Sequence, residues 1–154
     1  MTKTYPRPYR QQRQEGVAAV EFALIAAIFF TAFFGATELA RLVYVFNTTV
    51  EATRAGARIA VVCDNSNATV ATIRSRIKTL VPMLTDPEIT VSYLPNNSCN
   101  ADCTWATVKI VSTTQIQTFI PLVPLSLTLP SAATTLPRES MATTLGGGTN
   151  PMCQ

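Results

Sequence analysis

A single carboxylate lies inside an otherwise uncharged apolar segment near the start of the chain. The segment runs from Val17 to Thr37, and Glu21 is its only charged residue. An ionised carboxylate in an apolar medium is unfavourable unless a cation offsets it, so the chemistry predicted at Glu21 is ion pairing. No cation occurs within the segment. Either the partner comes from outside the segment, or Glu21 lies close enough to the membrane surface to reach water.

Four cysteines all lie after this apolar segment: Cys63, Cys99, Cys103 and Cys153. Cys99 and Cys103 are separated by three residues in a predicted loop, so we expect a disulfide there, with Cys63 and Cys153 as the complementary pair. Four cysteines allow three pairings, and the sequence does not choose between them. A zinc site is the disfavoured alternative because the C-x₃-C has no matching second pair and the chain has no histidine.

The stretch "RAGAR" places Arg54 and Arg58 four residues apart, on one face of a predicted helix, with Gly56 between them. One interpretation is a solvated helix face. The other is a helix-packing surface, in which small residues let another helix or the sheet approach closely and the arginines pair with its acids.

Catalytic chemistry has little support in the sequence. Histidine, the commonest general base, is absent, and the chain has neither a glycine-rich phosphate loop nor a G-x-S-x-G motif. Asp86 and Glu88 flank Pro87 in a turn, where acids are typically solvated or cap a helix. We therefore predict a protein that is not an enzyme and needs no cofactor or metal.

The apolar segment predicts a membrane-spanning helix. Its length, at about 1.5 Å per residue, gives roughly 30 Å, the thickness of the hydrocarbon core of a bilayer. Residues 1–16 carry four bases and one acid, whereas the rest of the chain carries eight of each. A basic flank predicts a cytoplasmic N-terminus and export of the residues beyond the span. The rest of the chain has no second basic patch, which argues against nucleic acid as a partner.

An α+β fold is predicted beyond the membrane. Proline is absent from residue 9 to 81, so the long N-terminal helix is expected to continue as an amphipathic helix to Val62. One packed helix is expected from Ala68 to Leu84, although Pro82 favours an earlier end. A small antiparallel sheet of three to four strands should come next. Its expected strands are residues 89–94, 105–114, 125–129 and 132–139. An extended connection is expected at residues 119–125. A flexible tail is expected from about residue 146.

Three interpretations of the N-terminal segment compete. A removed secretory signal requires a short apolar core and an A-x-A cleavage site, and neither is present. An uncleaved signal-anchor tolerates the length but does not explain Glu21. The third interpretation uses the spacing in "EGVAAVEF", where a hydrophobic residue comes directly after Gly16 and Glu21 lies five residues after that glycine.

This spacing resembles the processing site of type IV prepilins. More closely, "GVAAVEFALI", together with "TRAGARIA" and the late "RES" (residues 138–140), is similar to the TadE family of pseudopilins. That family belongs to the tight-adherence, or Flp-type, pilus machinery. The resemblance covers the N-terminal 60 residues or so and is only architectural beyond them. Phe22 comes after the glutamate where the major Flp pilins have tyrosine, and this chain is far longer, so a minor pseudopilin is favoured.

The resemblance implies a sequence of events. A prepilin peptidase would cut after Gly16, remove the leader (residues 1–16) and make Val17 the new N-terminus, with methylation as a further step. The resemblance also implies that Glu21 of one subunit would pair with the new amine of a neighbouring subunit. The expected partners are the peptidase, other minor pseudopilins, the major pilin, the inner-membrane assembly platform and membrane lipid.

The predicted function is therefore that of a minor pseudopilin needed for initiation or assembly of a pilus used in adhesion. The expected location is a bacterial inner membrane, crossed once by residues 17–37 of a helix at 17–62. The N-terminus would be cytoplasmic and residues 63–154 periplasmic, or extracellular after assembly. The alternative is a membrane-anchored periplasmic binding module with an uncleaved signal-anchor.

Overall fold

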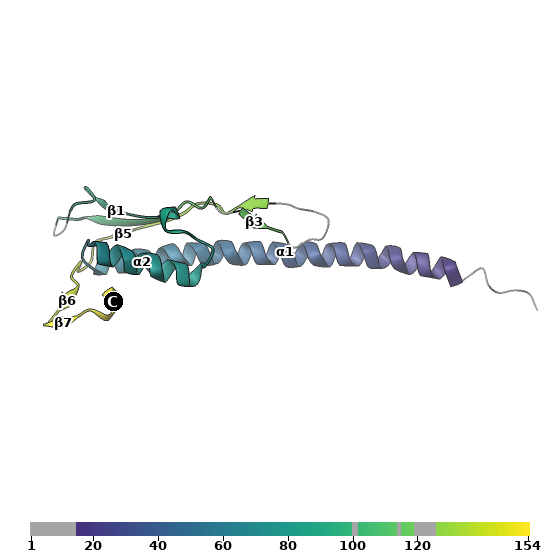
Figure 1. The fold of residues 1–154 in the computed structure, drawn as a ribbon, viewed down its shortest axis with the longest axis horizontal. Coiled ribbons are helices and arrows are strands. Elements are labelled where there is room, and N and C mark those ends of the chain that lie inside the picture. Colours follow the sequence, from purple (N-terminus) through teal and green to yellow (C-terminus); the bar gives the residue numbers. More distant parts are fainter. Residues whose placement is uncertain (1–14, 100–101, 114, 119–125) are drawn as a thin grey trace, which may run out of the picture. The chain divides into compact units, whose positions relative to one another are not determined.

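The computed structural model describes residues 15–99, 102–113, 115–118 and 126–154. Most of the predicted leader and the predicted extended segment at 119–125 lie outside the described residues. The chain divides into two compact units, Met1–Leu39 and Ala40–Gln154. A long first helix, a second helix and antiparallel strands confirm the predicted α+β class (Figure 1).

The first unit contains the N-terminal part of helix α1, which spans Glu15–Val62. Side chains from Val17 to Thr37 are exposed except for the half-buried Ala26. Two phenylalanine pairs stack one turn apart along the helix, Phe29 on Phe33 and Phe30 on Phe34. Such uniformly apolar and unpacked side chains are typical of a helix that lies in lipid.

The part of α1 in the second unit buries a face made of small residues. Threonines on this face satisfy their own hydroxyls, since Thr49 donates to the Val45 carbonyl (2.8 Å) and Thr53 to the Val50 carbonyl (2.7 Å). Small side chains leave the backbone accessible to close neighbours. The buried members of this face are Thr49, Ala52, Thr53, Gly56, Ala57 and Ala60.

Helix α2 spans Asn67–Leu80 and begins at a serine cap. The Ser66 hydroxyl accepts the backbone N–H of Thr69 at 3.2 Å, which satisfies one of the free donors of the first turn. Ile73 and Ile77 are fully buried. The helix ends four residues before the predicted Leu84, because Pro82 cannot continue the hydrogen-bonding pattern.

Three strands form the main sheet, in the order β1-β2-β5: β1 (Ile89–Leu94), β2 (Trp105–Ile110) and β5 (Ala132–Pro137). All pairings are antiparallel, and the register aligns Val91 with Val108 and Val108 with Thr134. These three residues share the face that points toward α1. Thr134 meets α1 directly, since its hydroxyl and that of Thr53 are hydrogen-bonded at 2.8 Å.

The predicted strand around residues 125–129 pairs outside the main sheet. Strand β4 (Ser126–Thr128) pairs with β3 (Gln115–Gln117) in a separate two-stranded sheet. A further pair joins β6 (Thr144–Leu145) to β7 (Gly148–Thr149), and its turn uses Gly146 and Gly147 at φ 61° and 87°. Two short 3₁₀ turns, η1 (Asp86–Glu88) and η2 (Pro151–Cys153), complete the elements. The segment expected to be a flexible tail thus holds β7 and η2.

Gly56 is the point where α1, α2 and the sheet meet. A Cβ atom at this position would lie 3.0 Å from Ile77 Cδ1, 3.1 Å from Ile73 Cγ2 and 3.4 Å from Val108 Cγ1. Glycine in a helix interior is unfavourable by roughly 1 kcal/mol relative to alanine. The absence of a side chain here lets three elements pack without a gap.

We predict that Gly56→Leu destabilises the second unit by about 1–3 kcal/mol, because the added side chain overpacks this junction. Chemical denaturation of the full chain in detergent, followed by near-ultraviolet circular dichroism, measures the change. Gly35→Leu is the control, since nothing lies within 4 Å of a Cβ atom at Gly35. Equal midpoints for Gly56→Leu and the unmodified chain would contradict the packing argument.

Tyr93 on β1 is buried with its hydroxyl lacking a hydrogen-bond partner among the described residues. Burial raises the pKa of Tyr93 to about 12, and the negative charge of Asp64 acts in the same direction. An unfolded tyrosine has a pKa of about 10. The fold therefore favours the neutral side chain. This contribution to stability is complete below pH 10 and is lost as the pH rises toward 12.

We predict that Tyr93→Phe weakens the loss of stability between about pH 10 and pH 12, because phenylalanine does not ionise. At neutral pH the variant should be as stable as the unmodified chain or more so, since a buried unpaired hydroxyl is removed. Denaturation midpoints across this pH range test both points. Tyr44→Phe, at a side chain that is 70% exposed, should leave the pH dependence unchanged.

Candidate assembly site and packing surfaces

Gly16, Val17 and Glu21 lie in the first two turns of α1. Val17 and Glu21 are four residues apart, which places them on one face of the helix with Cβ atoms about 6 Å apart. Their side chains are exposed, and a Cβ atom at Gly16 would meet nothing within 4 Å. Packing within the described residues therefore does not require a glycine at position 16.

Glu21 differs from the other polar side chains of the apolar segment. Thr31 donates to the Ala27 carbonyl at 2.8 Å, and Thr37 donates to the Phe34 carbonyl at 2.9 Å. Glu21 has no hydrogen bond or ion pair among the described residues. Within the span it is thus the one polar group that the helix itself leaves unsatisfied, as far as the described residues show.

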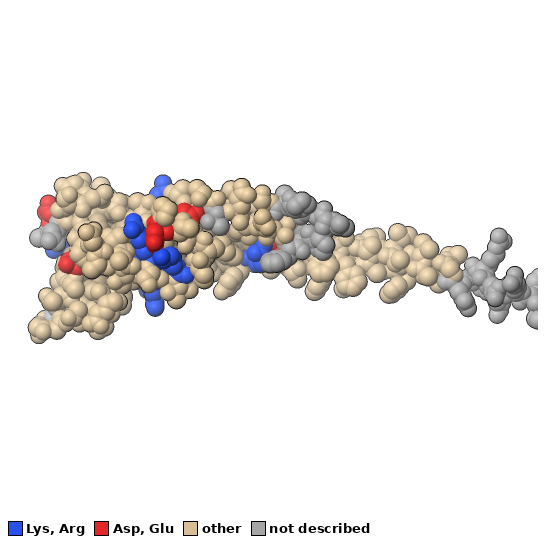
Figure 2. Space-filling model, in the orientation of Figure 1, with Lys and Arg blue, Asp and Glu red and all other residues tan. Residues whose placement is uncertain are grey.

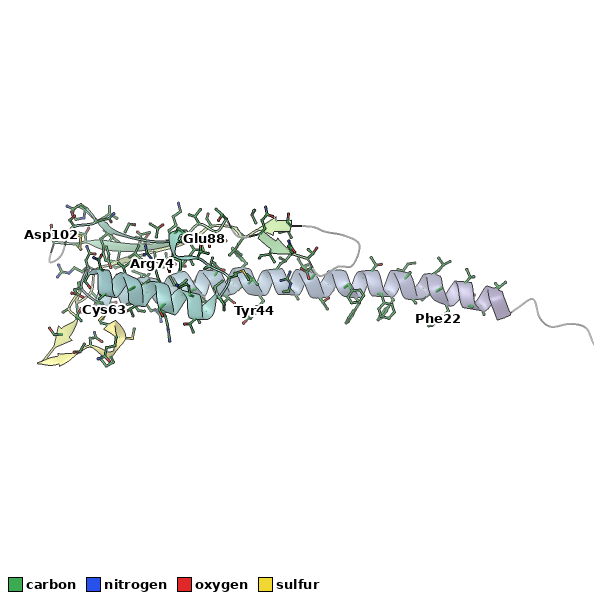
Figure 3. All side chains as sticks on the ribbon, in the orientation of Figure 1. Phe22, Tyr44, Cys63, Arg74, Glu88 and Asp102 are labelled. Atoms are coloured by element: carbon green, nitrogen blue, oxygen red, sulfur yellow. A yellow bond between two sulfur atoms is a disulfide. The ribbon has the colours of Figure 1, made fainter. Side chains whose placement is uncertain are left out.

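The surroundings of Glu21 are apolar. By length and composition α1 is able to cross a membrane, and the most apolar window of it, with a mean hydropathy of 2.3, is not buried at all. Figure 2 shows no charged side chain on the visible face of the apolar segment, and Figure 3 shows its side chains, such as Phe22, extending from the helix. A carboxylate in this setting requires either water or a cation.

The three predicted packing residues, Arg54, Gly56 and Arg58, have different surroundings in the structure. Gly56 is buried at the junction with α2 and β2, so its close contacts lie within the chain. Arg54 is exposed and forms an ion pair with Glu51 at 2.6 Å. An exposed pair of this kind contributes little to stability. Arg58 is exposed and has no acidic partner among the described residues.

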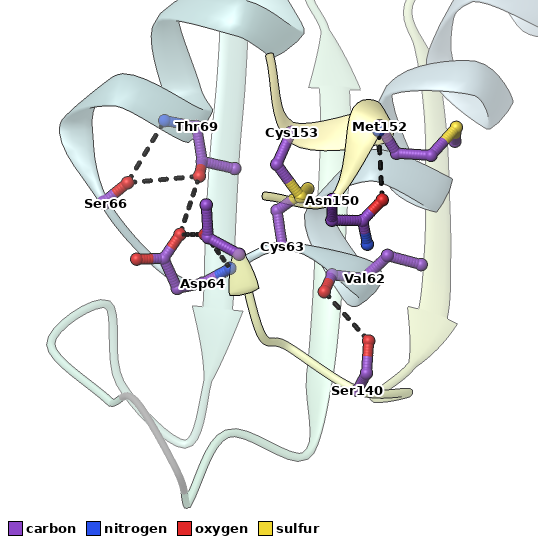
Figure 4. The surroundings of a disulfide bond; sticks show 10 residues. Val62, Cys63, Asp64, Ser66, Thr69, Ser140, Asn150, Met152 and Cys153 are labelled. Carbon is purple, nitrogen blue, oxygen red and sulfur yellow. Dashed lines mark hydrogen bonds between the residues drawn. A yellow bond between two sulfur atoms is a disulfide. The ribbon is translucent and has the colours of Figure 1, made fainter. Parts of the chain in front are cut away.

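The cysteines form two disulfides, Cys99–Cys103 and Cys63–Cys153. Cys63 comes directly after α1, so the second disulfide fastens η2 to the end of that helix (Figure 4). Asp64 adds to the same junction by accepting hydrogen bonds from the hydroxyls of Thr69 and Thr143. The C-terminal turn is thereby attached to α1 through a covalent bond and a side-chain network.

The segment after β5 caps the C-terminal end of α1. The backbone N–H groups of Glu139 and Met141 both donate to the Val61 carbonyl at 3.2 Å, and that of Ala142 donates to the Val62 carbonyl at 2.9 Å. The Ser140 hydroxyl also donates to the Val62 carbonyl, at 3.0 Å (Figure 4). Carbonyls at a helix end have no partner within the helix. Residues 139–142 supply partners from a distant part of the sequence.

The capping role of residues 139–142, which include the last two residues of "RES", is not predictable from the sequence, where the motif carries only a resemblance. Caps of a helix C-terminus usually come from residues that directly follow the helix. The only local signal here is a serine and a glutamate next to a predicted strand. The capped carbonyl lies far away in sequence, since Ser140 and Val62 are separated by 78 positions.

The turn acids Asp86 and Glu88 both have structural partners. Asp86 pairs with Lys78 at 2.8 Å, and this hydrogen bond lowers the pKa of the exposed Asp86 carboxyl, with further help from the charges of Lys78 and Arg74. Glu88 is buried and accepts from the backbone N–H groups of Thr85 and Thr113 (2.8 and 2.7 Å). The described residues also hold no cluster of three or more histidine, cysteine or acidic side chains suited to a metal.

Comparison with known proteins identifies the N-terminal segment. Residues 16–58 match the family described as TadE-like protein. The match confirms the resemblance predicted from the sequence, and it begins at Gly16. No curated protein and no solved structure matches the chain.

Proposed function

We propose, from the TadE-like segment at residues 16–58, that this chain is a minor pseudopilin of a tight-adherence pilus. The family match supports a pilus-associated structural protein, and the apolar helix supports anchoring in a membrane. The finer proposal is that a prepilin peptidase cuts after Gly16 and that the product takes part in pilus initiation and so in adhesion.

The observation that carries this proposal is the combination of Gly16 and Glu21 on one exposed helical segment. Nothing in the described residues packs against Gly16, and a glycine lets an external enzyme bind the backbone closely, as the proposed cut requires. Hydrolysis of the Gly16–Val17 peptide bond releases the leader and leaves an amino group on Val17. The cut thereby creates a cation on the same helix face as Glu21.

Electrostatics links this cut to assembly. Before cleavage, Glu21 has no partner among the described residues. After cleavage, the amine of a neighbouring subunit would offset the unfavourable burial of the carboxylate between packed helices. The leader also carries a net charge of +3, which is removed in the same step. Only processed subunits would then pair favourably in the membrane.

The proposed location rests on the charges of the leader. Four bases before the span favour a cytoplasmic N-terminus and a periplasmic second unit. The disulfides Cys63–Cys153 and Cys99–Cys103 are consistent with an oxidising compartment. The proposed partners are the prepilin peptidase, other minor pseudopilins, the major pilin and the inner-membrane assembly platform.

We predict that the protein extracted from membranes begins at Val17. Gly16→Leu should remain full-length, because a bulky side chain blocks the close approach needed for cutting, whereas Gly35→Leu should still be cut. N-terminal sequencing and intact-mass measurement read the outcome. An N-terminus at Met1 or Thr2 in the unmodified protein would instead favour a membrane-anchored binding module with an uncleaved signal-anchor.

We predict that Glu21→Gln is cut normally but fails to enter the sheared pilus fraction, because the amide keeps the shape of the side chain and loses its charge. Glu21→Asp should retain part of the incorporation, since the carboxylate remains. Immunoblots of cell and pilus fractions measure the ratio. Incorporation of Glu21→Gln at the level of the unmodified protein would refute ion pairing as the link between cutting and assembly.

A further inference from the structure

A cavity of about 330 Å³ opens on the second unit between α1, α2 and the C-terminal turn η2. Its size is at the lower end of the usual range for ligand pockets. Arg58 from α1 and Arg76 from α2 both line it, together with Ala55, Ile59, Thr72, Pro151, Met152 and Gln154. We call this space the Arg58–Arg76 cavity.

The two guanidinium groups of this cavity are not neutralised within the described part of the chain. Neither Arg58 nor Arg76 has an ion pair or hydrogen bond there. No acidic side chain lines the cavity, and Gln154, the last residue of the sequence, lines it without forming an ion pair with either arginine. Two neighbouring cations behave differently, since Arg54 pairs with Glu51 and Lys78 pairs with Asp86. Figure 2 shows basic side chains gathered on the face that carries α2.

The cavity combines these charges with an apolar floor and continues along α2. Ile59, which is nearly buried, and Met152 supply apolar surface, while the Thr72 hydroxyl is a further hydrogen-bond donor. An adjacent cavity of about 450 Å³ shares Thr72, Arg76 and Gln154 and extends to Ser75 and Thr79. The shape thus suits an extended segment better than a single small ion.

We propose that the Arg58–Arg76 cavity receives an acidic peptide segment of a neighbouring pilus subunit, with a carboxylate held by the two guanidinium groups. Arginine forks match carboxylates in a bidentate geometry, and the apolar floor suits the stem of a glutamate or an adjoining apolar side chain. The identity of the partner as a pilus subunit rests on the proposed function, whereas the preference for a carboxylate rests on the cavity alone.

Two other anionic partners fit less well. A nucleic acid is held by a broad series of phosphate contacts, and this site offers two arginines in a hollow of limited size. An anionic lipid surface is attracted by clustered bases on an exposed face, and it does not require an apolar floor between two elements. A carboxylate on a peptide uses the guanidinium groups and the floor together.

The test places a photo-crosslinking amino acid at Ser75, an exposed residue of the adjacent cavity, in the full chain in pilus-producing cells. We expect a cross-link to another pilus subunit, located by mass spectrometry next to an aspartate or glutamate of that subunit. In the double variant Arg58→Glu and Arg76→Glu, the yield should fall about tenfold or more, as for loss of a charged pair. The double variant Arg58→Lys and Arg76→Lys should retain part of it.

Arg54→Glu is the matched control, because Arg54 lies one turn before Arg58 and outside the cavity lining. It should keep the full cross-link. Denaturation midpoints of the charge-reversed protein should equal those of the unmodified chain, which separates loss of binding from loss of folding. A cross-link that survives reversal of both arginines would overturn the proposal, as would binding to phosphatidylglycerol vesicles that requires Arg58 and Arg76 while no subunit is cross-linked.

The N-terminus of each variant is sequenced in the same samples. If Val17 is the N-terminus and the protein enters pili, but no acidic segment is cross-linked, the cavity proposal fails while the proposed function stands. If Met1 or Thr2 is the N-terminus, the proposed function fails. An arginine-dependent cross-link to an acidic segment of a protein outside the pilus would then retain the carboxylate preference and overturn the partner.

Discussion

The second unit depends on the close approach of three elements at Gly56. Helix α1 has no side chain there, so Ile73 and Ile77 of α2 and Val108 of β2 fill the space against its backbone. The neighbouring small residues of α1 extend this contact along the helix, and Thr53 adds a hydrogen bond to β5. A small domain has few large side chains to bury, so tight packing of this kind contributes much of its cohesion.

This arrangement creates a second requirement at the end of α1. The last carbonyls of the helix lie beside the buried core, where unpaired polar groups are costly. The backbone of residues 139–142 satisfies them, and the Cys63–Cys153 disulfide holds η2 against the same helix end. The covalent link and the cap act on one junction, so the residues after β5 are a structural part of the unit.

Periodicity in the sequence predicted the elements whose signal is local. The apolar run and the absence of proline located α1, the 3.6-residue pattern located α2, and the alternation around Ile89 and Trp105 located β1 and β2. The third strand of the main sheet was harder to predict from the sequence, because β5 packs over small residues of α1 and itself consists largely of alanine and threonine. The stronger leucine alternation near Leu127 belongs to the separate β3–β4 pair.

Residues of the candidate sites also differ in how far the sequence alone can indicate them. The proposal for Gly16 and Glu21 rests on a short spacing that the sequence shows directly. Arg76 could not be singled out in this way, because only folding brings α2 beside Arg58. The C-terminal cap was equally hidden, since Ser140 and Val62 are far apart in sequence. A motif with a short spacing is visible in the sequence, while sites shaped by packing require the three-dimensional structure.

The charges that the described residues leave unpaired are where an assembling subunit would differ from a self-contained anchored domain. Exposed charges in water need no partner, and pairs such as Arg54–Glu51 add little. Glu21 is different because it lies in an apolar segment that is able to cross a membrane. Arg58 and Arg76 are exposed but line a cavity that also has apolar side chains. Charges in such surroundings gain most from a partner that also excludes water. Under the proposed function, the carboxylate and the two guanidinium groups are thus the positions where contact with another subunit would change the free energy most.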